Sequence, residues 1–284
     1  MMRETRDSDI TPPCRALVLG GGGARGALQV GALRALCEAD MCFDLLVGTS
    51  AGAVNATYLA VHGVDVDTLA QLREAWQEAG EADLLPTSYL RLSMCLLLGH
   101  VGDMDGRLEA FYRRYGMDDS LTFGDIDGVR LIQVAADLAT YRPRLYGTRP
   151  DQSVLEGLLA STAVPPWVWP MERGQHRVMD GGLVSNLPVE PALRQGATAI
   201  IALDLSDWRF LEEPTTRSRR RYMAQMLATM ERREIELELR LAELSGVPVW
   251  RVPLRADPPA PFWDFTTIER MFVQGYEQMT AYID

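Results

Sequence analysis

The amino-acid sequence predicts an α/β protein with a mainly parallel central sheet and helices on both faces. Short apolar stretches alternate with longer stretches in which apolar residues recur at helical spacing. Several short stretches, such as ATAIIALDL at 197–205, are apolar along their whole length, as strands covered on both faces are. The sequence contains no internal repeat, low-complexity segment or clear linker. We therefore expect one domain over residues 14–284, preceded by a disordered polar tail over residues 1–13.

A strand, a loop and a helix follow one another twice at the start of this domain. Residues 15–20 are apolar enough for a buried strand, and the spacing of apolar residues predicts a helix over 25–39. Residues 43–61 repeat this order with a short strand, a tight turn and a helix, and another helix is expected over 65–79.

The rest of the chain continues the alternation after a less regular stretch over 80–128, where a helix is expected near GRLEAFYRRYG. The remaining expected elements are strands at 129–140, 142–148, 176–180, 197–205 and 247–254, and helices at 153–161, 217–246 and from Thr267 to the end. Within the long helix at 217–246, the acidic and basic residues of ERREIELELR, 231–240, are expected to support one another mostly through i,i+4 pairs.

Composition and charge exclude several kinds of function. The formal net charge is −11, so a nucleic-acid partner is not expected. The chain contains no lysine, and this excludes a P-loop lysine, a Schiff base and a lysine general base. Four cysteines without a CxxC pair and three histidines suggest neither a zinc site nor a disulfide framework. No metal or organic cofactor is expected.

The stretch LVLGGGGARG at 17–26 contains four consecutive glycines. Since glycine has no side chain, the backbone of this loop is expected to make the functional contacts. Gly21 to Gly26 fit the dinucleotide fingerprint G-x-G-x-x-G after a strand. That interpretation also requires an acidic residue at the end of the second strand. Asp44 stands at the beginning of that strand instead, and the strand ends in GTSAG. A nucleotide-binding oxidoreductase therefore stays a lesser alternative.

The pentapeptide GTSAG, Gly48 to Gly52, has the form G-x-S-x-G of a nucleophile elbow. Ser50 would stand on a sharp turn between strand and helix, and the flanking glycines, Gly48 and Gly52, would relieve crowding there. The alternative is that Ser50 only caps the helix that follows.

A serine nucleophile needs a base, and the sequence offers few candidates. His62 follows the elbow helix too closely to return to Ser50, while His100 and His176 have the surroundings of loop or surface residues. The remaining candidate is Asp180 in MDGGLVSNLP, at a predicted strand end beside two glycines. An Asx-turn is the alternative role for an aspartate before glycine.

Four stretches together resemble the patatin-like phospholipase family in order and spacing, from residue 16 to about 206. They are LVLGGGGARGALQVGALRAL, GTSAGAVNA, ASTAVPPWVWP and DGGLVSNLP. The resemblance implies a three-layer α/β/α fold and a Ser–Asp dyad without histidine, in which Ser50 is the nucleophile and Asp180 the base. It also implies an oxyanion hole in the glycine-rich loop. That loop consists of Gly21, Gly22, Gly23, Ala24, Arg25 and Gly26. One departure is Gln29, where bacterial members often carry histidine.

The resemblance implies a serine acyl hydrolase that cleaves phospholipid or other lipid acyl esters through an acyl-serine. Backbone N–H groups of the loop would stabilise the charge that develops on the carbonyl oxygen. An aspartate is a weak base for a hydroxyl, so we expect a water-poor site that raises the pKa of Asp180. Arg25 would brace the loop, add positive potential or form a packing salt bridge. A lipid-binding or scaffolding protein with little turnover is the alternative from another class.

Contact with a membrane surface is expected to be peripheral. No run of eighteen apolar residues occurs and the N-terminus lacks the apolar part of a secretory signal, so a cytoplasmic protein is expected.

Three segments have alternative roles at a lipid surface or within the fold. The apolar segment 88–100 is suited to a lid or chain-binding helix, or to an ordinary core helix. The basic cluster RSRRR at 217–221 could dock on anionic lipid or be a solvated helix start. Prolines flank an aromatic set that could form an interfacial belt or pack on the core: Trp167, Trp169, Phe262 and Trp263. The sequence leaves the oligomeric state open.

Overall fold

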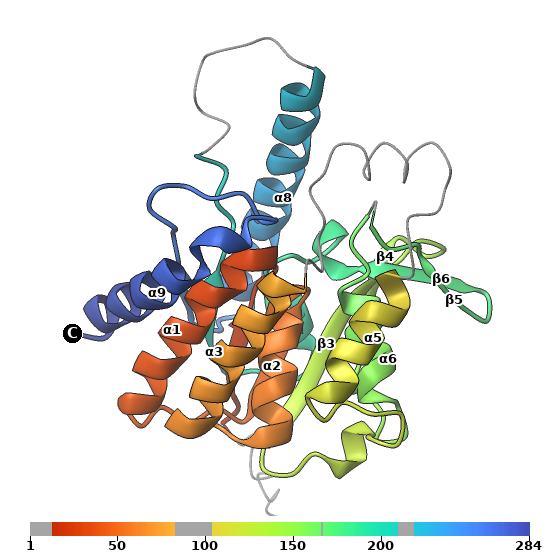
Figure 1. Ribbon diagram of the computed structural model, residues 1–284, viewed down its shortest axis with the longest axis horizontal. Coiled ribbons are helices and arrows are strands. Elements are labelled where there is room, and N and C mark those ends of the chain that lie inside the picture. Colours follow the sequence, from red (N-terminus) through yellow and green to blue (C-terminus); the bar gives the residue numbers. More distant parts are fainter. Residues whose placement is uncertain (1–12, 83–103, 166, 210–218) are drawn as a thin grey trace, which may run out of the picture.

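The protein is built on an eight-stranded sheet in a computed structural model that describes residues 13–82, 104–165, 167–209 and 219–284 (Figure 1). The strand order is β5-β6-β3-β2-β1-β7-β8, with β4 also paired to β3. The strands are β1 (Arg15–Leu19), β2 (Leu45–Thr49), β3 (Arg130–Asp137), β4 (Arg142–Tyr146), β5 (Met171–Arg173), β6 (His176–Asp180), β7 (Ala199–Asp204) and β8 (Val249–Pro253). The tail expected over 1–13, except for Pro13, and the segment 88–100 lie outside the described residues.

Helices cover both faces of this sheet. They are α1 (Gly26–Glu38), α2 (Ala51–His62), α3 (Val66–Glu81), α5 (Met104–Arg114), α6 (Val154–Ser161), α7 (Val189–Arg194), α8 (Arg219–Leu244) and α9 (Ile268–Ile283), with short 3-10 turns η1 (Gly23–Arg25), η2 (Phe123–Asp125), η3 (Gly181–Leu183) and η5 (Phe265–Thr267). None of the helices in the described ranges is long and apolar enough to cross a membrane.

The two sides of each central strand build two separate cores. In β1, Leu17 and Leu19 pack with residues of α1, α2, α3 and α9, whereas Ala16 and Val18 pack with residues of α7 and α8. This alternation follows from the period of two along a strand. In Figure 1, α1, α2 and α3 lie side by side in front of the sheet. The predicted three-layer α/β/α class is confirmed.

The sheet is parallel in its centre and antiparallel at one side. Strands β3, β2, β1, β7 and β8 pair in parallel, while β4, β5 and β6 are antiparallel to their neighbours. The sequence predicted a mainly parallel sheet and the two strands that form β3 and β4. It did not predict the short strand β5 or the helix α7, because segments of three and six residues are too short to show periodicity.

The pairing of β3 brings two distant segments together. Strand β2 pairs with β3 from Arg130 to Val134, and β6 pairs with it from Ala135 to Asp137. Since β4 occupies the other edge of β3 over 133–137, β2 and β6 lie on the same edge and run toward each other. Their carboxyl ends therefore meet, with Thr49 opposite Val134 and Asp180 opposite Ala135.

Candidate active site

Ser50 stands on a strained turn between β2 and α2. Its φ is 53°, a left-handed value that is uncommon for residues other than glycine. A Cβ on Gly48 would overlap the Gly52 carbonyl, and a Cβ on Gly52 would overlap the Leu19 carbonyl, so both positions require glycine. Ser161 supports the turn, because its Oγ accepts a hydrogen bond from the Ser50 N–H (3.0 Å) and donates one to the Val134 carbonyl (2.6 Å).

Asp180 is held at the end of β6, where the backbone turns into η3. Its N–H donates to the Ala163 carbonyl (3.0 Å), and its Oδ1 accepts from the Gly182 N–H (2.8 Å) in the manner of an Asx-turn. The other carboxyl oxygen, Oδ2, is buried and has no hydrogen-bond partner of good geometry among the described residues. The Asx-turn therefore uses one carboxyl oxygen of Asp180 and leaves the other without a partner.

Burial dominates the electrostatics of this carboxyl group. Asp180 is 7% exposed, and the loss of hydration raises its pKa to about 6, although the Ser50 hydroxyl and the Gly182 amide act in the opposite direction. The expected desolvation of Asp180 is confirmed. The Ser50 hydroxyl and this carboxyl form no hydrogen bond of good geometry, and hydrogen bonds between catalytic groups are often long before a substrate binds.

The glycine-rich loop leaves two consecutive amides unused. The Gly21 N–H donates to the Asn186 carbonyl (2.9 Å), and the Ala24 N–H donates to the Phe262 carbonyl (2.7 Å). The N–H groups of Gly22 and Gly23 have no hydrogen-bond partner among the described residues. Both residues line the same cavity as Ser50 and Asp180. The N–H of Ala51, the first residue of α2, also has no hydrogen-bond partner among the described residues.

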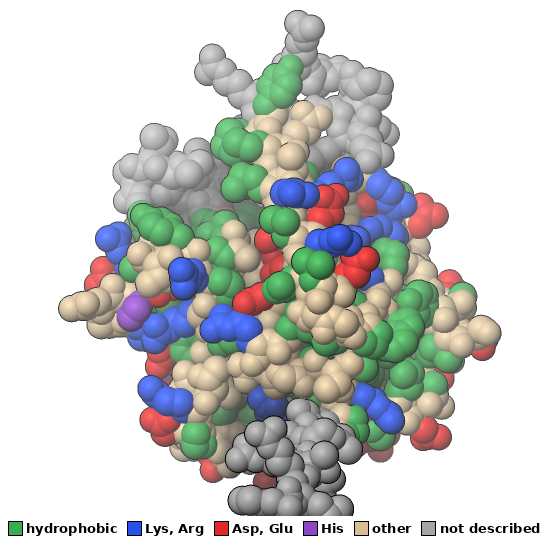
Figure 2. Space-filling view, turned by 180° about the vertical axis from the view of Figure 1, so that it is seen from behind, with side chains coloured by type: hydrophobic (Ala, Val, Ile, Leu, Met, Phe, Trp, Pro, Cys, Tyr) green, Lys and Arg blue, Asp and Glu red, His purple; other side chains and the backbone are tan. Residues whose placement is uncertain are grey.

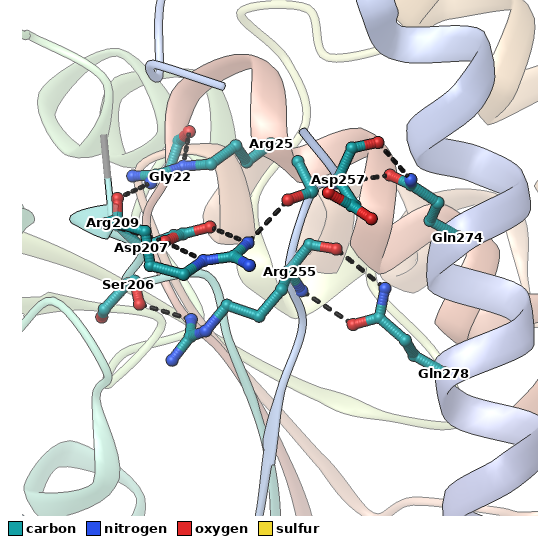
Figure 3. Close-up of polar contacts among 10 residues, drawn as sticks. Gly22, Arg25, Ser206, Asp207, Arg209, Arg255, Asp257, Gln274 and Gln278 are labelled. Carbon is teal, nitrogen blue, oxygen red and sulfur yellow. Dashed lines mark hydrogen bonds and ion pairs between the residues drawn. The ribbon is translucent and has the colours of Figure 1, made fainter. Parts of the chain in front are cut away.

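Arg25 fixes the loop through backbone carbonyls. Its Nε–H donates to the Gly22 carbonyl (3.3 Å) and its Nη1 donates to the Asp207 carbonyl (2.6 Å), so the side chain connects the loop to the segment after β7 (Figure 3). Arg209 binds the Asp207 carboxylate (2.7 Å) and the Ala256 carbonyl (2.6 Å). Of the roles considered for Arg25, bracing the loop is the one these contacts fit.

The side chain of Gln29 also supports the glycine-rich loop through hydrogen bonds. Its Nε2 donates to the Gly20 carbonyl (2.9 Å) and to the Leu203 carbonyl (3.2 Å), and its Oε1 accepts from Asn55 (2.9 Å). Asn55 in turn accepts from the Trp76 indole (2.8 Å). The side chain that departs from the family pattern is therefore fully buried in a polar chain that connects α1, α2 and α3.

A cavity of about 440 Å³ connects these groups with an apolar interior. Ser50, Asp180, Gly21, Gly22, Gly23 and Arg25 line it, while Ala24, Gly26, Gly48 and Gly52 support it from outside. Its buried end is formed by apolar side chains that are at most 7% exposed: Tyr58, Leu72, Trp76, Leu108, Tyr112 and Met117. Its other end is bounded by the exposed side chains of Leu183, Leu227 and Met230. The cavity thus passes from the surface, past Ser50, into the core.

The aromatic residues flanked by prolines contribute one wall. Phe262 lines the cavity and contacts Trp167, with ring centroids 5.9 Å apart, and Trp263, at 4.8 Å. Trp169 is largely exposed. Packing of this set on the core is observed for Trp167, and an interfacial role of the exposed Trp169 stays a prediction.

Helix α8 contributes carboxylates that the sequence analysis assigned to surface pairs. Glu231 binds Asn186 and Trp208, and Glu238 accepts from Ser185 Oγ (2.6 Å) and from the Glu190 N–H (2.7 Å). Burial raises the pKa of Glu231, Glu234 and Glu238. The expected i,i+4 pairing was wrong for them. Two exposed ion pairs among the described side chains of this helix are i,i+3 pairs, Arg233–Glu236 and Arg240–Glu243. A spacing of three and four from Glu231 to Glu238, in register with buried Ala228 and Ile235, could have revealed the inward face.

The histidines that the structure describes lie away from Ser50. His176 is on β6 rather than in a loop, and its Nδ1 is 2.6 Å from Asp137 Oδ2. His62 ends α2, and its Nε2 lies 2.9 Å from the Tyr115 carbonyl. Neither residue lines the cavity. His100 lies outside the described residues.

A family model for patatin-like phospholipases matches residues 17–193, more than half of the chain. The chain belongs to the patatin-like phospholipase family. The matched range includes the glycine-rich loop, Ser50 and Asp180. The resemblance inferred from the four motifs is confirmed at the level of the family.

Relatives in this family are longer proteins. Patatin-like phospholipase domain-containing protein 7 of Mus musculus is 29% identical over 204 residues, which cover 69% of this chain and 14% of that protein. For protein 6 of Homo sapiens the values are 30% over 218 residues, 72% and 14%. An uncharacterized NTE family protein of Mycobacterium tuberculosis is 29% identical over 192 residues, covering 66% of this chain and 30% of that protein. The chain therefore spans less than a third of the length of these relatives.

A solved structure has a similar fold. VipD from Legionella pneumophila matches with a TM-score of 0.52 at 16% identity, over 96% of this chain and 67% of that chain. At this identity the likeness concerns the fold alone.

Proposed function

We propose that this protein is a serine acyl hydrolase of lipid acyl esters, with Ser50 as nucleophile and Asp180 as base. The observation that carries the proposal is the meeting of the carboxyl ends of β2 and β6 on one edge of β3. It brings a hydroxyl on a strained elbow and a desolvated carboxyl to one cavity beside two unused backbone amides.

In the proposed cycle, Asp180 accepts the proton of the Ser50 hydroxyl while Oγ attacks the ester carbonyl carbon. The oxygen that becomes negative is stabilised by the N–H groups of Gly22 and Gly23, and the positive end of α2 adds to this. When the intermediate collapses, the alcohol leaves with the proton from Asp180 and an acyl-serine remains. Water then gives a proton to Asp180 and attacks the acyl carbon, and the acid leaves as Ser50 regains its proton.

The apolar end of the cavity indicates the substrate class. Six large side chains of α2, α3, α5 and the turn after α5 enclose a space without charged walls. An acyl chain that enters it loses its contact with water, and each buried methylene contributes about 0.8 kcal/mol. We therefore propose that the acyl chain occupies this end and that the alcohol part of the ester lies toward Leu183, Leu227 and Met230.

Covalent labelling with a fluorophosphonate probe and hydrolysis of p-nitrophenyl esters of graded chain length test the proposal together. We expect the probe to modify Ser50, as located by mass spectrometry, and the rate to rise with chain length to an optimum. The variant Ser50→Ala is the matched control and should neither react with the probe nor hydrolyse the esters. A wild-type protein that binds the esters without labelling at Ser50 would instead be a lipid-binding protein, and the proposal would be abandoned.

The variant Ser161→Ala is expected to slow the reaction without removing a reacting group. It leaves the Ser50 N–H and the Val134 carbonyl without their buried partner, which costs about 1–3 kcal/mol of stability. The strained turn at Ser50 then loses its support, and we expect kcat to fall about tenfold with KM nearly unchanged, since the apolar end of the cavity is intact. Steady-state kinetics with a p-nitrophenyl ester measure both parameters.

Ser153→Ala is the control for this variant, because Ser153 stands at the opposite end of the same helix. Its Oγ caps α6 by accepting from the Glu156 N–H (3.2 Å). Its loss should cost about 1 kcal/mol of stability and leave kcat unchanged. Equal effects of the two variants on kcat would show that Ser161 acts only through the stability of α6.

A further inference from the structure

The N-terminal half of α8 extends beyond the other described elements (Figure 1), and after the arginines at 219–221 it carries no charge as far as Met230. The stretch YMAQMLATM, residues 222–230, contains no acidic or basic residue. Five large apolar side chains are exposed there: Tyr222 (58%), Met223 (56%), Met226 (48%), Leu227 (48%) and Met230 (60%). At about 100° per residue they spread over about 140° of the helix circumference. Figure 2 shows hydrophobic side chains along this extending part of the helix.

The C-terminal half of α8 has a different surface. Its exposed apolar residues, Leu237, Leu241 and Leu244, form a narrow stripe at spacings of four and three. The ion pairs Arg233–Glu236 and Arg240–Glu243 lie beside that stripe and are well exposed. This half has the mixed polar surface that helices in contact with water have. The wide uncharged surface is thus confined to residues 222–230.

This uncharged surface is continuous with the candidate active site. Leu227 and Met230 line the cavity that contains Ser50, yet about half of each side chain is exposed to the outside. Leu183, close to Asp180 in sequence, is also half exposed and lines the same end. The same side chains therefore form both the wall of the entrance and the outer surface around it.

We propose that residues 222–230 of α8 insert into the surface of a lipid bilayer and place the entrance of the cavity against it. This inference rests on the proposed function, because a lipid ester that leaves a bilayer for Ser50 would then pass between apolar side chains and not through water. Uncharged helix surfaces with large apolar side chains insert to the depth of the headgroup boundary. Four arginines in RSRRR, 217–221, precede the stretch in sequence and favour anionic headgroups despite the net charge of −11.

The test compares two double variants of the full chain in binding to vesicles. Met223→Gln/Met226→Gln removes two exposed side chains that do not line the cavity, and glutamine preserves helix propensity. Leu237→Gln/Leu241→Gln makes the same kind of change on the other half of the helix. The probes are vesicles of phosphatidylcholine with phosphatidylglycerol and vesicles of phosphatidylcholine alone, with binding followed by flotation.

We expect the Met223/Met226 variant to bind mixed vesicles about tenfold or more weakly than the wild type. Its rate on a water-soluble short-chain p-nitrophenyl ester should be unchanged, and the Leu237/Leu241 variant should match the wild type in both measurements. Wild-type binding should be stronger with phosphatidylglycerol present.

Two results would overturn the inference. One is equal vesicle binding by the wild type and the Met223/Met226 variant. The other is a wild-type dimer in light scattering that both double variants dissociate, because the stripe along α8 would then be an interface between two copies. If the wild type binds vesicles more strongly than the Met223/Met226 variant and yet does not hydrolyse esters at Ser50, the proposed function is rejected. That result would still support the membrane-binding role of residues 222–230.

Discussion

Replacing Asp180 with asparagine is expected to lower kcat for ester hydrolysis about 10²- to 10⁴-fold, the typical contribution of a general base. Asparagine has the same shape and can accept the Gly182 N–H through its carbonyl oxygen, so the turn at η3 is preserved. It cannot take the proton of Ser50. Because the two residues act as a unit, the double variant with Ser50→Ala should be no slower than Ser50→Ala alone.

The pH dependence gives this prediction a second readout. The base must be ionised, and burial raises the pKa of Asp180 to about 6. The wild-type kcat/KM should therefore be constant above about pH 7 and fall tenfold per unit at low pH, with a midpoint near that pKa. The residual activity of Asp180→Asn should lack this transition. A wild-type kcat/KM that stays constant from about pH 5 to about pH 8 would contradict the assignment of Asp180 as the base.

Thermal unfolding separates a catalytic loss from a folding defect. The pKa of Asp180 is raised on folding, so the native state favours the protonated form. Ionisation of Asp180 therefore destabilises the native state as pH rises from the unfolded pKa through the folded one. Asparagine removes this penalty. At about pH 8 we expect Asp180→Asn to unfold at a temperature no lower than that of the wild type. At about pH 5.5 the difference in unfolding temperature should be smaller. A much lower unfolding temperature would mean that the kinetic loss reflects damage to the fold.

The sequence predicted the elements of the fold where periodicity was strong. The two strand–loop–helix units at the start of the domain have apolar runs and glycine turns that leave few alternatives, and β1, α1, β2 and α2 end within a few residues of the expected positions. The extent of a single domain over 14–284 and a cytoplasmic location stay predictions. The short elements β5 and α7 were missed because local sequence does not determine them.

The meeting of Ser50 and Asp180 depends on information that no local pattern contains. It arises because β6 reverses direction and takes the edge of β3 that β2 leaves free after Val134. The family resemblance implied the pair, whereas the local pattern alone left Asp180 as the remaining candidate, with an Asx-turn as its alternative role. Ser161 was present in the stretch ASTAVPPWVWP, but its role follows only from the hydrogen bond to the Ser50 N–H. Its position at the end of the apolar stretch SVLEGLLAS was the local signal in the sequence.

Replacing Gly23 with alanine is expected to lower kcat about 10²- to 10³-fold, as loss of an oxyanion-hole donor does. Gly23 has a φ of +56°, and a Cβ there would overlap the Phe262 carbonyl oxygen and lie 3.0 Å from its carbon. That carbonyl cannot simply move away, because it accepts the Ala24 N–H (2.7 Å). The loop must therefore shift, and the amides of Gly22 and Gly23 shift with it. KM should change little, since the buried end of the cavity is built from other elements.

Gly174→Ala is the control that separates this displacement from backbone strain. Gly174 has a similar φ of +62°, but a Cβ there would have no neighbour within 4 Å. Both alanines pay the same left-handed backbone cost of about 1–2 kcal/mol. Only the Gly23 variant should lose activity, measured as kcat on a p-nitrophenyl ester at a temperature where both variants are folded. If Gly23→Ala hydrolyses the ester at the wild-type rate, the Gly22 and Gly23 amides do not stabilise the transition state, and the donors must be sought elsewhere, beginning with the Ala51 N–H.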